Sequence, residues 1–234
     1  DVTVLVGGHG PVTDQLEAAG VAYESLRWLR RAVHPVRDVL AVFEIARALR
    51  RLKPDLVSTH TAKAGSAGRL ACRLAGMRSL YTPHGWPAGE RMGPLAGAMF
   101  VLVERVMARW CEAILCVCES ERRLALEKRI APADKLFVVP NGVRDVCAEL
   151  RAQPGRTAAR ICSVARFEHP KDHRTLLEAL TLLPNQNWQL DLVGDGPGQA
   201  EMRSLAERLG LGARVRFHGY LADPSQLLAK AQMF

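Results

Sequence analysis

The amino-acid sequence predicts an α/β protein built from two doubly wound parallel-sheet domains. Short β-branched or apolar runs alternate with longer stretches of helical period, which is typical of βαβ units. The alternation stops across one polar, proline- and glycine-bearing segment, CAELRAQPGRTAAR, and then starts again. Of the 234 residues, 48% are hydrophobic and 24% are charged, which excludes the disordered and fibrous classes.

The first series contains strand-like runs separated by helical stretches. The runs are rich in Val, Ile and Leu and read DVTVLV, VAYESL, DLVSTH, SLYT, AILCVC and LFVV. Apolar residues at helical spacing predict the helices over 12–19, 36–52, 66–75, 94–110 and 119–129. Strands joined through helices lie parallel in one sheet. We therefore expect an N-terminal domain over residues 1–145.

The second series repeats the pattern on a smaller scale. ARICSVARF, WQLDLVG and RVRFHG read as strands, and helices are expected over 174–183, over 198–209 and from Pro224. We assign residues 146–159 to a linker and 160–234 to the second domain. Three strands are few for such a sheet, so we expect this domain to be incomplete.

Charge, aromatic content and cysteine pattern indicate which binding partners and which cellular compartment to expect. The formal charge of +8 favours phosphate-bearing substrates, anionic membrane or nucleic acid. Aromatic residues make up only 6% and do not interleave with basic ones, which disfavours nucleic acid. The six cysteines form no C-x-x-C pair and are typical of a reduced, cytoplasmic protein. The longest apolar stretch, 95–103, is too short to cross a bilayer.

Ligands of doubly wound domains bind at the carboxyl ends of the strands, so the loops there hold the candidate residues. YTPHGW places His84 between a proline and a glycine directly after a strand. Pro83 and Gly85 are also ordinary turn residues, so loop filler is the alternative explanation. RFEHPK carries Arg166 and Lys171, which could neutralise a diphosphate, or form a solvated surface pair.

Two further loops could hold anions at helix N-termini. GDGPG (194–198) follows a strand and opens a helix, although Gln199 breaks the dinucleotide pattern and a tight turn is the alternative. THTAKAG places His60, Lys63 and the N–H groups around Gly65 and Ser66 at a second helix start, where a capped turn is the alternative.

Metal binding is not expected. No Asp-x-Asp pair is present in the sequence, and Pro170 interrupts the H-x-x-x-H spacing of His169 and His173. We expect no cofactor and no metal, with cationic side chains neutralising a leaving diphosphate instead.

Taken together, these motifs resemble those of the family 4 glycosyltransferases of GT-B fold. The similarity is greatest to bacterial members that extend capsule, exopolysaccharide or O-antigen chains. It rests on DLVSTHTAKAGSAGRLACRLAG, YTPHGW, ILCVCESERRLAL, VVPNGVRDV, SVARFEHPKDHRTLLEAL and LVGDGPGQAEMRSLAERLGL, in the family's order. The resemblance implies two Rossmann-like domains facing a cleft.

The resemblance also implies roles for particular residues. His84, Arg166 and Lys171 would be catalytic, and the last two would hold the donor diphosphate. Other donor or nucleotide contacts would come from Gly194, Asp195, Leu221, Asp223, Asn141 and Gly142. His60, Lys63 and Gly65 would bind the acceptor. The family's first strand would precede Asp1 and its E-x7-E segment would follow Phe234, so we expect this stretch alone to be inactive.

By the same resemblance, the intact enzyme would be a retaining, metal-independent glycosyltransferase. It would move a hexosyl or N-acetylhexosaminyl group from a nucleotide-diphosphate sugar to a lipid-linked or oligosaccharide acceptor in surface polysaccharide synthesis. A nucleotide-sugar 2-epimerase of the same fold, distinguished by its product, is one alternative. A non-catalytic nucleotide-sugar-binding module is another, and a dinucleotide oxidoreductase ranks below both.

The span 26–53 is basic and amphipathic. Arginine and lysine outnumber acidic residues there and alternate with apolar side chains such as Val39 and Phe43. Such a helix could lie on the anionic inner face of the cytoplasmic membrane, where a lipid-linked acceptor is embedded. The alternative is a sheet-covering helix with a solvated basic face.

Overall fold

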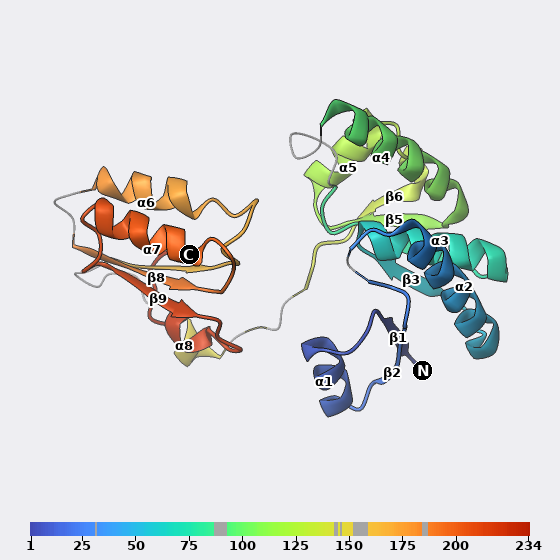
Figure 1. The fold of residues 1–234 in the computed structure, drawn as a ribbon, viewed down its shortest axis with the longest axis horizontal. Coiled ribbons are helices and arrows are strands. Elements are labelled where there is room, and N and C mark those ends of the chain that lie inside the picture. Colours follow the sequence, from blue (N-terminus) through green and yellow to red (C-terminus); the bar gives the residue numbers. More distant parts are fainter. Residues whose placement is uncertain (31, 87–92, 143–144, 146, 152–158, 184–186) are drawn as a thin grey trace. The chain divides into compact units, whose positions relative to one another are not determined.

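The computed structural model describes residues 1–30, 32–86, 93–142, 145, 147–151, 159–183 and 187–234. Their contacts divide the chain into two compact units, unit 1 (Asp1–Gly142) and unit 2 (Val143–Phe234). In both units parallel strands alternate with helices, as the sequence predicts (Figure 1). The predicted linker, 146–159, falls largely on residues 146 and 152–158, which lie outside the described residues.

The strands of unit 1 are parallel, as expected, but in the described residues they form two separate sheets rather than one. In the smaller one, β1 (Thr3–Val6) pairs with β2 (Ala22–Ser25), and α1 (Pro11–Ala18) connects them. The larger sheet has the sequential order β3 (Val57–His60), β4 (Ser79–Thr82), β5 (Ala113–Cys116) and β6 (Leu136–Val138). Its connecting helices are α3 (Ala62–Ala75), α4 (Pro94–Met107) and α5 (Glu119–Glu127), while α2 (Pro35–Leu52) leads from β2 to β3.

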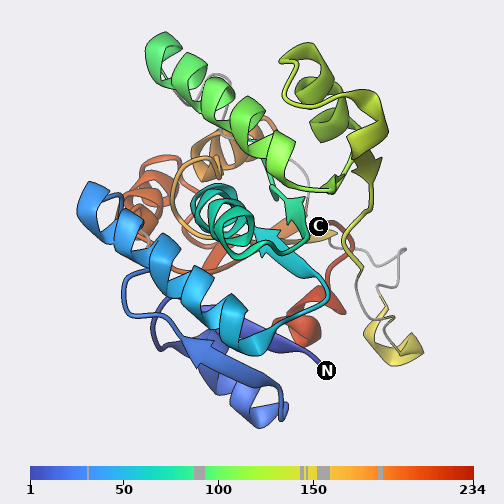
Figure 2. The ribbon, with the colours of Figure 1, turned by 90° about the vertical axis from the view of Figure 1, so that its right-hand side faces the viewer.

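Helices α2 and α3 pack side by side in unit 1, as Figure 2 shows. Val42, Ile45 and Leu49 recur at helical spacing on α2 and form a buried cluster with Ala71 and Cys72 of α3. Each buried aliphatic side chain of this size contributes about 1.5–3 kcal/mol. The opposite face of α2 exposes apolar side chains at Val36, Val39, Leu40 and Phe43.

Helix α3 begins earlier than its sequence indicates. We expected a loop as far as Gly65 and a helix from Ser66, but the helix starts at Ala62, where Ala-Lys-Ala are strong helix formers. Gly65 and Gly68 lie three residues apart against the sheet. A Cβ at Gly65 would meet the Tyr81 ring at 2.3 Å, and one at Gly68 would meet Thr59 at 2.7 Å. These glycines therefore let the helix approach β3 and β4 closely.

A fully buried ion pair joins three elements of unit 1. Arg69 of α3 and Glu104 of α4 are both 0% exposed, and one guanidinium nitrogen donates to both carboxylate oxygens at 2.9 Å. Arg69 Nε donates to the Gly65 carbonyl, and the guanidinium carbon lies 3.7 Å from the centre of the Tyr81 ring on β4. Burial raises the pKa of Glu104, and the Arg69 charge opposes that rise.

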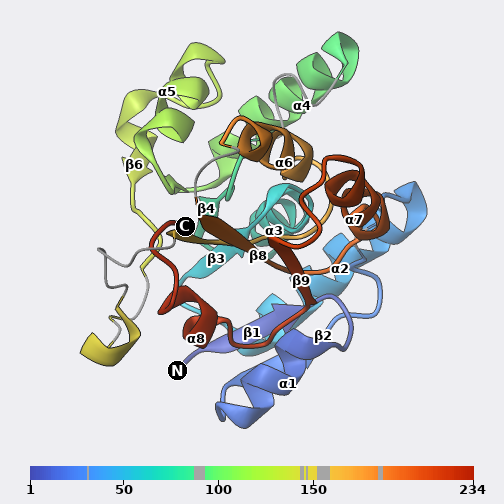
Figure 3. The same cartoon turned by 90° about the vertical axis from the view of Figure 1, so that its left-hand side faces the viewer.

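Unit 2 is a three-stranded parallel sheet covered on both faces. Its strands run in the order β7 (Ala159–Val164), β8 (Trp188–Val193) and β9 (Val215–Gly219). Figures 1 and 3 show α6 (His173–Thr181) and α7 (Gln199–Arg208) together on one face of the sheet and the short α8 (Ser225–Leu228) apart from them. Alternation along the strands explains this, because Leu190 and Leu192 face α6 and α7 while Val193 belongs to the cluster with α8.

One buried carboxylate connects the three strands of unit 2. Asp191 on β8 is 2% exposed and accepts a hydrogen bond from Arg160 Nε on β7 at 3.0 Å. Its other oxygen lies 2.6 Å from Nε2 of His218 on β9. Burial raises the pKa of Asp191, but the bonds from His218 and Arg160 outweigh it and hold that pKa below its usual range. A polar network thus fixes the strands beneath their carboxyl ends.

None of the described helices is both long and apolar enough to cross a bilayer.

We expect Glu104→Gln to destabilise unit 1 by about 3–5 kcal/mol, because it leaves the Arg69 charge buried without a counter-charge. Hydrogen exchange of peptides from α3, β4 and α4 measures the loss. Replacing both partners, as Arg69→Met with Glu104→Leu, should recover much of it. Equal exchange in Glu104→Gln and the unaltered protein would contradict the role of the pair.

We expect Asp191→Asn to cost unit 2 about 2–3 kcal/mol near neutral pH, through loss of two charge-assisted hydrogen bonds. The pKa of Asp191 is lowered in the folded state. The ionised carboxylate therefore adds to the free energy of unfolding above the unfolded-state pKa of about 3.9, and this stabilisation is lost as pH falls through the folded-state pKa. The two proteins should therefore converge in stability toward strongly acid pH. Urea unfolding followed on β8 amide signals tests this, with Glu207→Gln on the exposed face of α7 as control.

Candidate active site

The predicted residues of unit 1 gather at the carboxyl end of its larger sheet. His60 is the last residue of β3, and His84 lies two residues beyond the end of β4. Because His60 pairs with Thr82 in the parallel register, His84 comes within reach of it. Nδ1 of His60 and Nε2 of His84 are 3.0 Å apart, and Ser58 Oγ lies 3.0 Å from the other ring nitrogen of His60. Ser58, His60 and His84 form one hydrogen-bonded chain.

The loop that carries His84 is held on both sides. Pro83 and Trp86 are buried, and the Trp86 indole N–H donates to the Glu121 carbonyl at 3.1 Å. His84 itself is exposed and has φ 54°, a left-handed conformation that costs a residue other than glycine about 1–3 kcal/mol. The anchored loop therefore forces an exposed imidazole into a strained backbone position beside His60.

The environment of His60 favours its neutral form. Burial is the larger cause and the nearby His84 the smaller, and together they lower the pKa of His60 from its usual value. A neutral imidazole offers one donor and one acceptor nitrogen. Both ring nitrogens of His60 are engaged, so the tautomer of His60 decides whether it donates to His84 or accepts from it.

Lys63 and Gly65 have structural partners in unit 1. The Lys63 ammonium lies 2.7 Å from an Asp38 carboxylate oxygen and donates to the Ala32 carbonyl. The expectation of a free N–H group at Gly65 is wrong, because the earlier helix start lets Gly65 N–H donate to the Thr61 carbonyl at 2.9 Å. Gly65 is also buried against Tyr81, which explains the glycine by packing.

Unit 2 has a cavity of about 500 Å³ where its three strands end. Residues that follow β7, β8 and β9 supply most of its wall. The lining consists of Val164, Ala165, Arg166, Val193, Gly194, Asp195, Gly196, Tyr220 and Leu221. Four residues that the sequence singles out, Arg166, Gly194, Asp195 and Leu221, are thus brought together at one opening.

The GDGPG turn uses its glycines for close backbone approach. A Cβ at Gly194 would lie 2.0 Å from the Ala165 carbonyl oxygen, and one at Gly196 would lie 2.8 Å from that of Phe167. Three glycine N–H groups of this turn are taken up inside the protein. Gly198 N–H donates to Phe167, Gly194 N–H to Gly219, and Gly196 N–H to the Asp195 side chain. These bonds make GDGPG a tight turn between β8 and α7, and an anion at the first turn of α7 stays a prediction.

Arg166 supplies a cationic side chain to the wall of the cavity. Its guanidinium pairs with Glu168 at 3.0 Å and is 59% exposed. Such a surface ion pair contributes only about 0–1 kcal/mol, so a phosphate could take the place of Glu168. Lys171 lies on the same loop and is exposed, but it does not line the cavity.

The other sequence candidates lie outside this cavity. Asp223 Oδ1 accepts from the Ser225 N–H and hydroxyl, and these bonds lower the pKa of Asp223 while they start α8. Asn141 and Gly142 are exposed residues that follow β6 in unit 1. His173 is buried and stacks on Phe167 with ring centres 4.2 Å apart.

Sequence reasoning missed Tyr220. It lines the cavity and its side chain is 71% exposed, which is unusual for a large aromatic residue. Its position one residue after β9, in HGYLAD, was the signal that could have identified it. An exposed aromatic ring at a strand end can stack on a planar ligand group.

Comparison with known protein families bears on both units. Residues 1–142 match the model of the glycosyl transferase 4-like domain. The chain belongs to this family. Residues 149–234 match the glycosyl transferases group 1 model, so this glycosyl transferase 4-like chain carries a glycosyltransferase domain in each half.

Curated relatives of this glycosyl transferase 4-like chain act in polysaccharide synthesis. The UDP-Gal:alpha-D-GlcNAc-diphosphoundecaprenol alpha-1,3-galactosyltransferase of Escherichia coli is 26% identical over 144 residues, covering 61% of the chain and 37% of the relative. The O-antigen biosynthesis glycosyltransferase WbnH of Escherichia coli is 25% identical over 182 residues, covering 78% and 51%. The chain thus spans about a third to a half of the length of these relatives.

Solved structures place the fold among the GT-B glycosyltransferases, as the sequence predicts. Anabaena Alr3699/HepE, in complex with UDP and glucose, superposes with a TM-score of 0.80 at 20% identity, covering 98% of this chain and 64% of that one. The lipopolysaccharide outer core galactosyltransferase WaaB has a TM-score of 0.67 at 15% identity, covering 98% and 71%. At such identities the likeness shows the fold alone.

We expect His84→Gln to raise the pKa of His60, because it removes the neighbouring ring whose electrostatic influence is the smaller of the two causes that lower that pKa. The rise should be partial, since burial remains. The stability that neutral His60 contributes is present above its unfolded pKa of about 6.5 and declines as pH falls below that value. Titration of the imidazole C–H signals by NMR measures the shift, with His9→Gln as control. An unchanged His60 pKa in His84→Gln would count against the pair.

Proposed function

We propose that this protein is a retaining, metal-independent glycosyltransferase that takes its sugar from a nucleotide diphosphate. The observation that carries the proposal is the unit 2 cavity at the strand carboxyl ends, with Arg166 in its wall, in a member of the glycosyl transferase 4-like family. A UDP-sugar is the donor we favour. Support comes from the name of the Escherichia coli galactosyltransferase and from UDP in the HepE complex.

The proposed roles follow from the chemistry of each group. The bond from the anomeric carbon to the diphosphate oxygen breaks, and the acceptor hydroxyl oxygen bonds to that carbon on the same face. Arg166 and Lys171 stabilise the charge that develops on the departing diphosphate. Tyr220 stacks on the base. His84 orients the hydroxyl and, with His60 beside it, can accept its proton.

The acceptor is proposed to be a lipid-linked saccharide at the inner face of the cytoplasmic membrane. The diphosphoundecaprenol in the name of the Escherichia coli relative supports this choice. Exposed Val36, Val39, Leu40 and Phe43 on α2, close in sequence to Arg47 and Arg50, support contact with an anionic membrane. The transferred group would be a hexosyl or N-acetylhexosaminyl unit.

We expect UDP to bind this chain, and Arg166→Gln to weaken that binding by about tenfold or more, because one charge-assisted phosphate contact is lost. Isothermal titration calorimetry measures the change. Arg208→Gln, at the exposed end of α7, removes the same charge from unit 2 outside the cavity and should leave the affinity within about twofold. If both substitutions weakened UDP binding equally, Arg166 would act only through the net charge of unit 2 and not through a direct contact with the phosphate.

The reaction itself is tested with UDP-sugars and a lipid-linked saccharide in the longest natural form of the protein. A new glycosidic bond of retained configuration, formed equally with and without a metal chelator, is the expected result. Epimerised nucleotide sugar without transfer would replace the proposal with a 2-epimerase. Binding without turnover of any kind would leave a nucleotide-sugar-binding module.

A further inference from the structure

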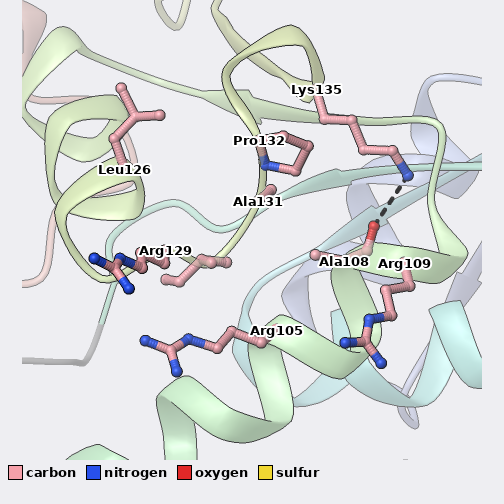
Figure 4. Close-up of a pocket in the computed structure, with 9 residues that line it drawn as sticks. Arg105, Ala108, Arg109, Leu126, Arg129, Ala131, Pro132 and Lys135 are labelled. Carbon is pink, nitrogen blue, oxygen red and sulfur yellow. Dashed lines mark hydrogen bonds between the residues drawn. The ribbon is translucent and has the colours of Figure 1, made fainter.

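Unit 1 contains a second cavity, of about 570 Å³, away from the histidine pair. It lies between the C-terminal end of α4 with the following 3₁₀ turn and the segment that joins α5 to β6 (Figure 4). Its wall carries four cationic side chains, Arg105, Arg109, Arg129 and Lys135. The remaining lining residues are Ala108, Leu126, Ile130, Ala131 and Pro132.

This cavity lies at the opposite edge of the sheet from His60 and His84. The 3₁₀ turn (Ala108–Trp110) ends shortly before β5 begins at Ala113, and Lys135 immediately precedes β6. Because all strands of the larger sheet are parallel, residues before β5 and β6 lie at its amino-terminal edge. His60 and His84 lie at the carboxyl-terminal edge. The second cavity is therefore separate from the proposed reaction site.

The charge of this cavity is uncompensated within the described part of the chain. Its lining includes no carboxylate, and none of the four cations forms an ion pair with a described aspartate or glutamate. Figure 4 shows the guanidinium groups of Arg105 and Arg129 near one another, on the left, and the charged ends of Arg109 and Lys135 apart from them, on the right. Like charges around one cavity repel one another, and an anion bound among them relieves that repulsion.

Two of the cations have an evident structural task. Arg105 donates twice to the Lys128 carbonyl, just after α5, and Lys135 Nζ donates to the Ala108 and Cys111 carbonyls, just after α4. Cations at helix C-termini are stabilising. These bonds also fix both side chains beside the cavity. Among the described residues, the side chains of Arg109 and Arg129 donate no hydrogen bond to a helix C-terminal carbonyl, so helix capping does not explain why they are cationic.

We propose that this cavity binds a phosphate-bearing anion, held between Arg129 with Arg105 on one side and Arg109 with Lys135 on the other. One guanidinium group can donate two parallel hydrogen bonds to two oxygens of a phosphate, and an ammonium group adds a point charge. The cavity is open to a phosphate group carried by a small soluble molecule or by an anionic lipid headgroup. The chemistry at the cavity is the same for both.

The test uses the ¹⁵N-labelled chain and two probes, inorganic pyrophosphate and vesicles of phosphatidylcholine with or without phosphatidylglycerol. Pyrophosphate should give saturable amide shifts at residues 108–112, 129–131 and 133–136. Arg109→Gln with Arg129→Gln should weaken this response by about tenfold or more, because two charged contacts are lost. Neither substitution removes a hydrogen bond of the described fold, and circular dichroism confirms that the variant folds.

Two controls separate this site from general charge and from the proposed donor cavity. Arg73→Gln with Arg123→Gln removes the same charge from exposed positions of unit 1 outside the lining, and should change the affinity by less than about twofold. Arg166→Gln should leave the unit 1 shifts unaltered, whatever it does to signals from unit 2. The result is thus independent of the proposed function.

Each outcome decides the proposal. Shifts with pyrophosphate that the cavity variant loses establish a site for a soluble phosphate-bearing molecule. Retention on phosphatidylglycerol vesicles alone, lost in the cavity variant and kept in its control, assigns the site to a lipid headgroup. A chain that responds to neither probe, or a control that loses as much as the cavity variant, overturns the proposal.

Discussion

The buried pair of Arg69 and Glu104 is the interaction on which the arrangement of unit 1 depends. Two charges removed from water are stabilised only by one another and by nearby polar or aromatic groups, so the pair favours the arrangement of α3, β4 and α4 that brings them together. Gly65 is part of this constraint, because it leaves room for the Tyr81 ring that the guanidinium covers. The same strand, β4, leads directly into Pro83 and His84. The register of β4 against β3 then brings His84 beside His60.

In unit 2, hydrogen bonds rather than a fully buried ion pair hold the strands and turns in place. Its strands are joined by the Asp191 network, and its βα turns are joined backbone to backbone, with Phe167 N–H donating to Asp195 and Gly198 N–H to Phe167. The glycines of GDGPG make that approach possible. The cavity is therefore lined by rigidly connected turns, while Arg166 and Tyr220 extend from them as exposed side chains. A rigid frame with exposed contact groups suits binding of a polar ligand.

Several features could be predicted from residues close in sequence. Alternating apolar runs located the strands, and the position of His84, Arg166 and Gly194 after those runs placed them at strand carboxyl ends. The glycines of THTAKAGSAG and GDGPG were harder to interpret. A glycine required by a neighbouring strand and one required by a bound anion look the same in a sequence. Only the distances from Gly65 to Tyr81 and from Gly194 to Ala165 distinguish them.

The sequence by itself determined the α/β class, the order of strands and helices, and the edge at which the candidate residues lie, because these depend on local periodicity and chain direction. Tertiary structure decided which of those residues meet. In the folded chain His60 contacts His84, and Lys63 forms an ion pair with Asp38. Tyr220 lines the unit 2 cavity, and the second cavity, at the amino-terminal edge of the larger sheet, is lined by Arg105, Arg109, Arg129 and Lys135. Contacts between distant segments depend on strand register and helix packing, which no local pattern encodes.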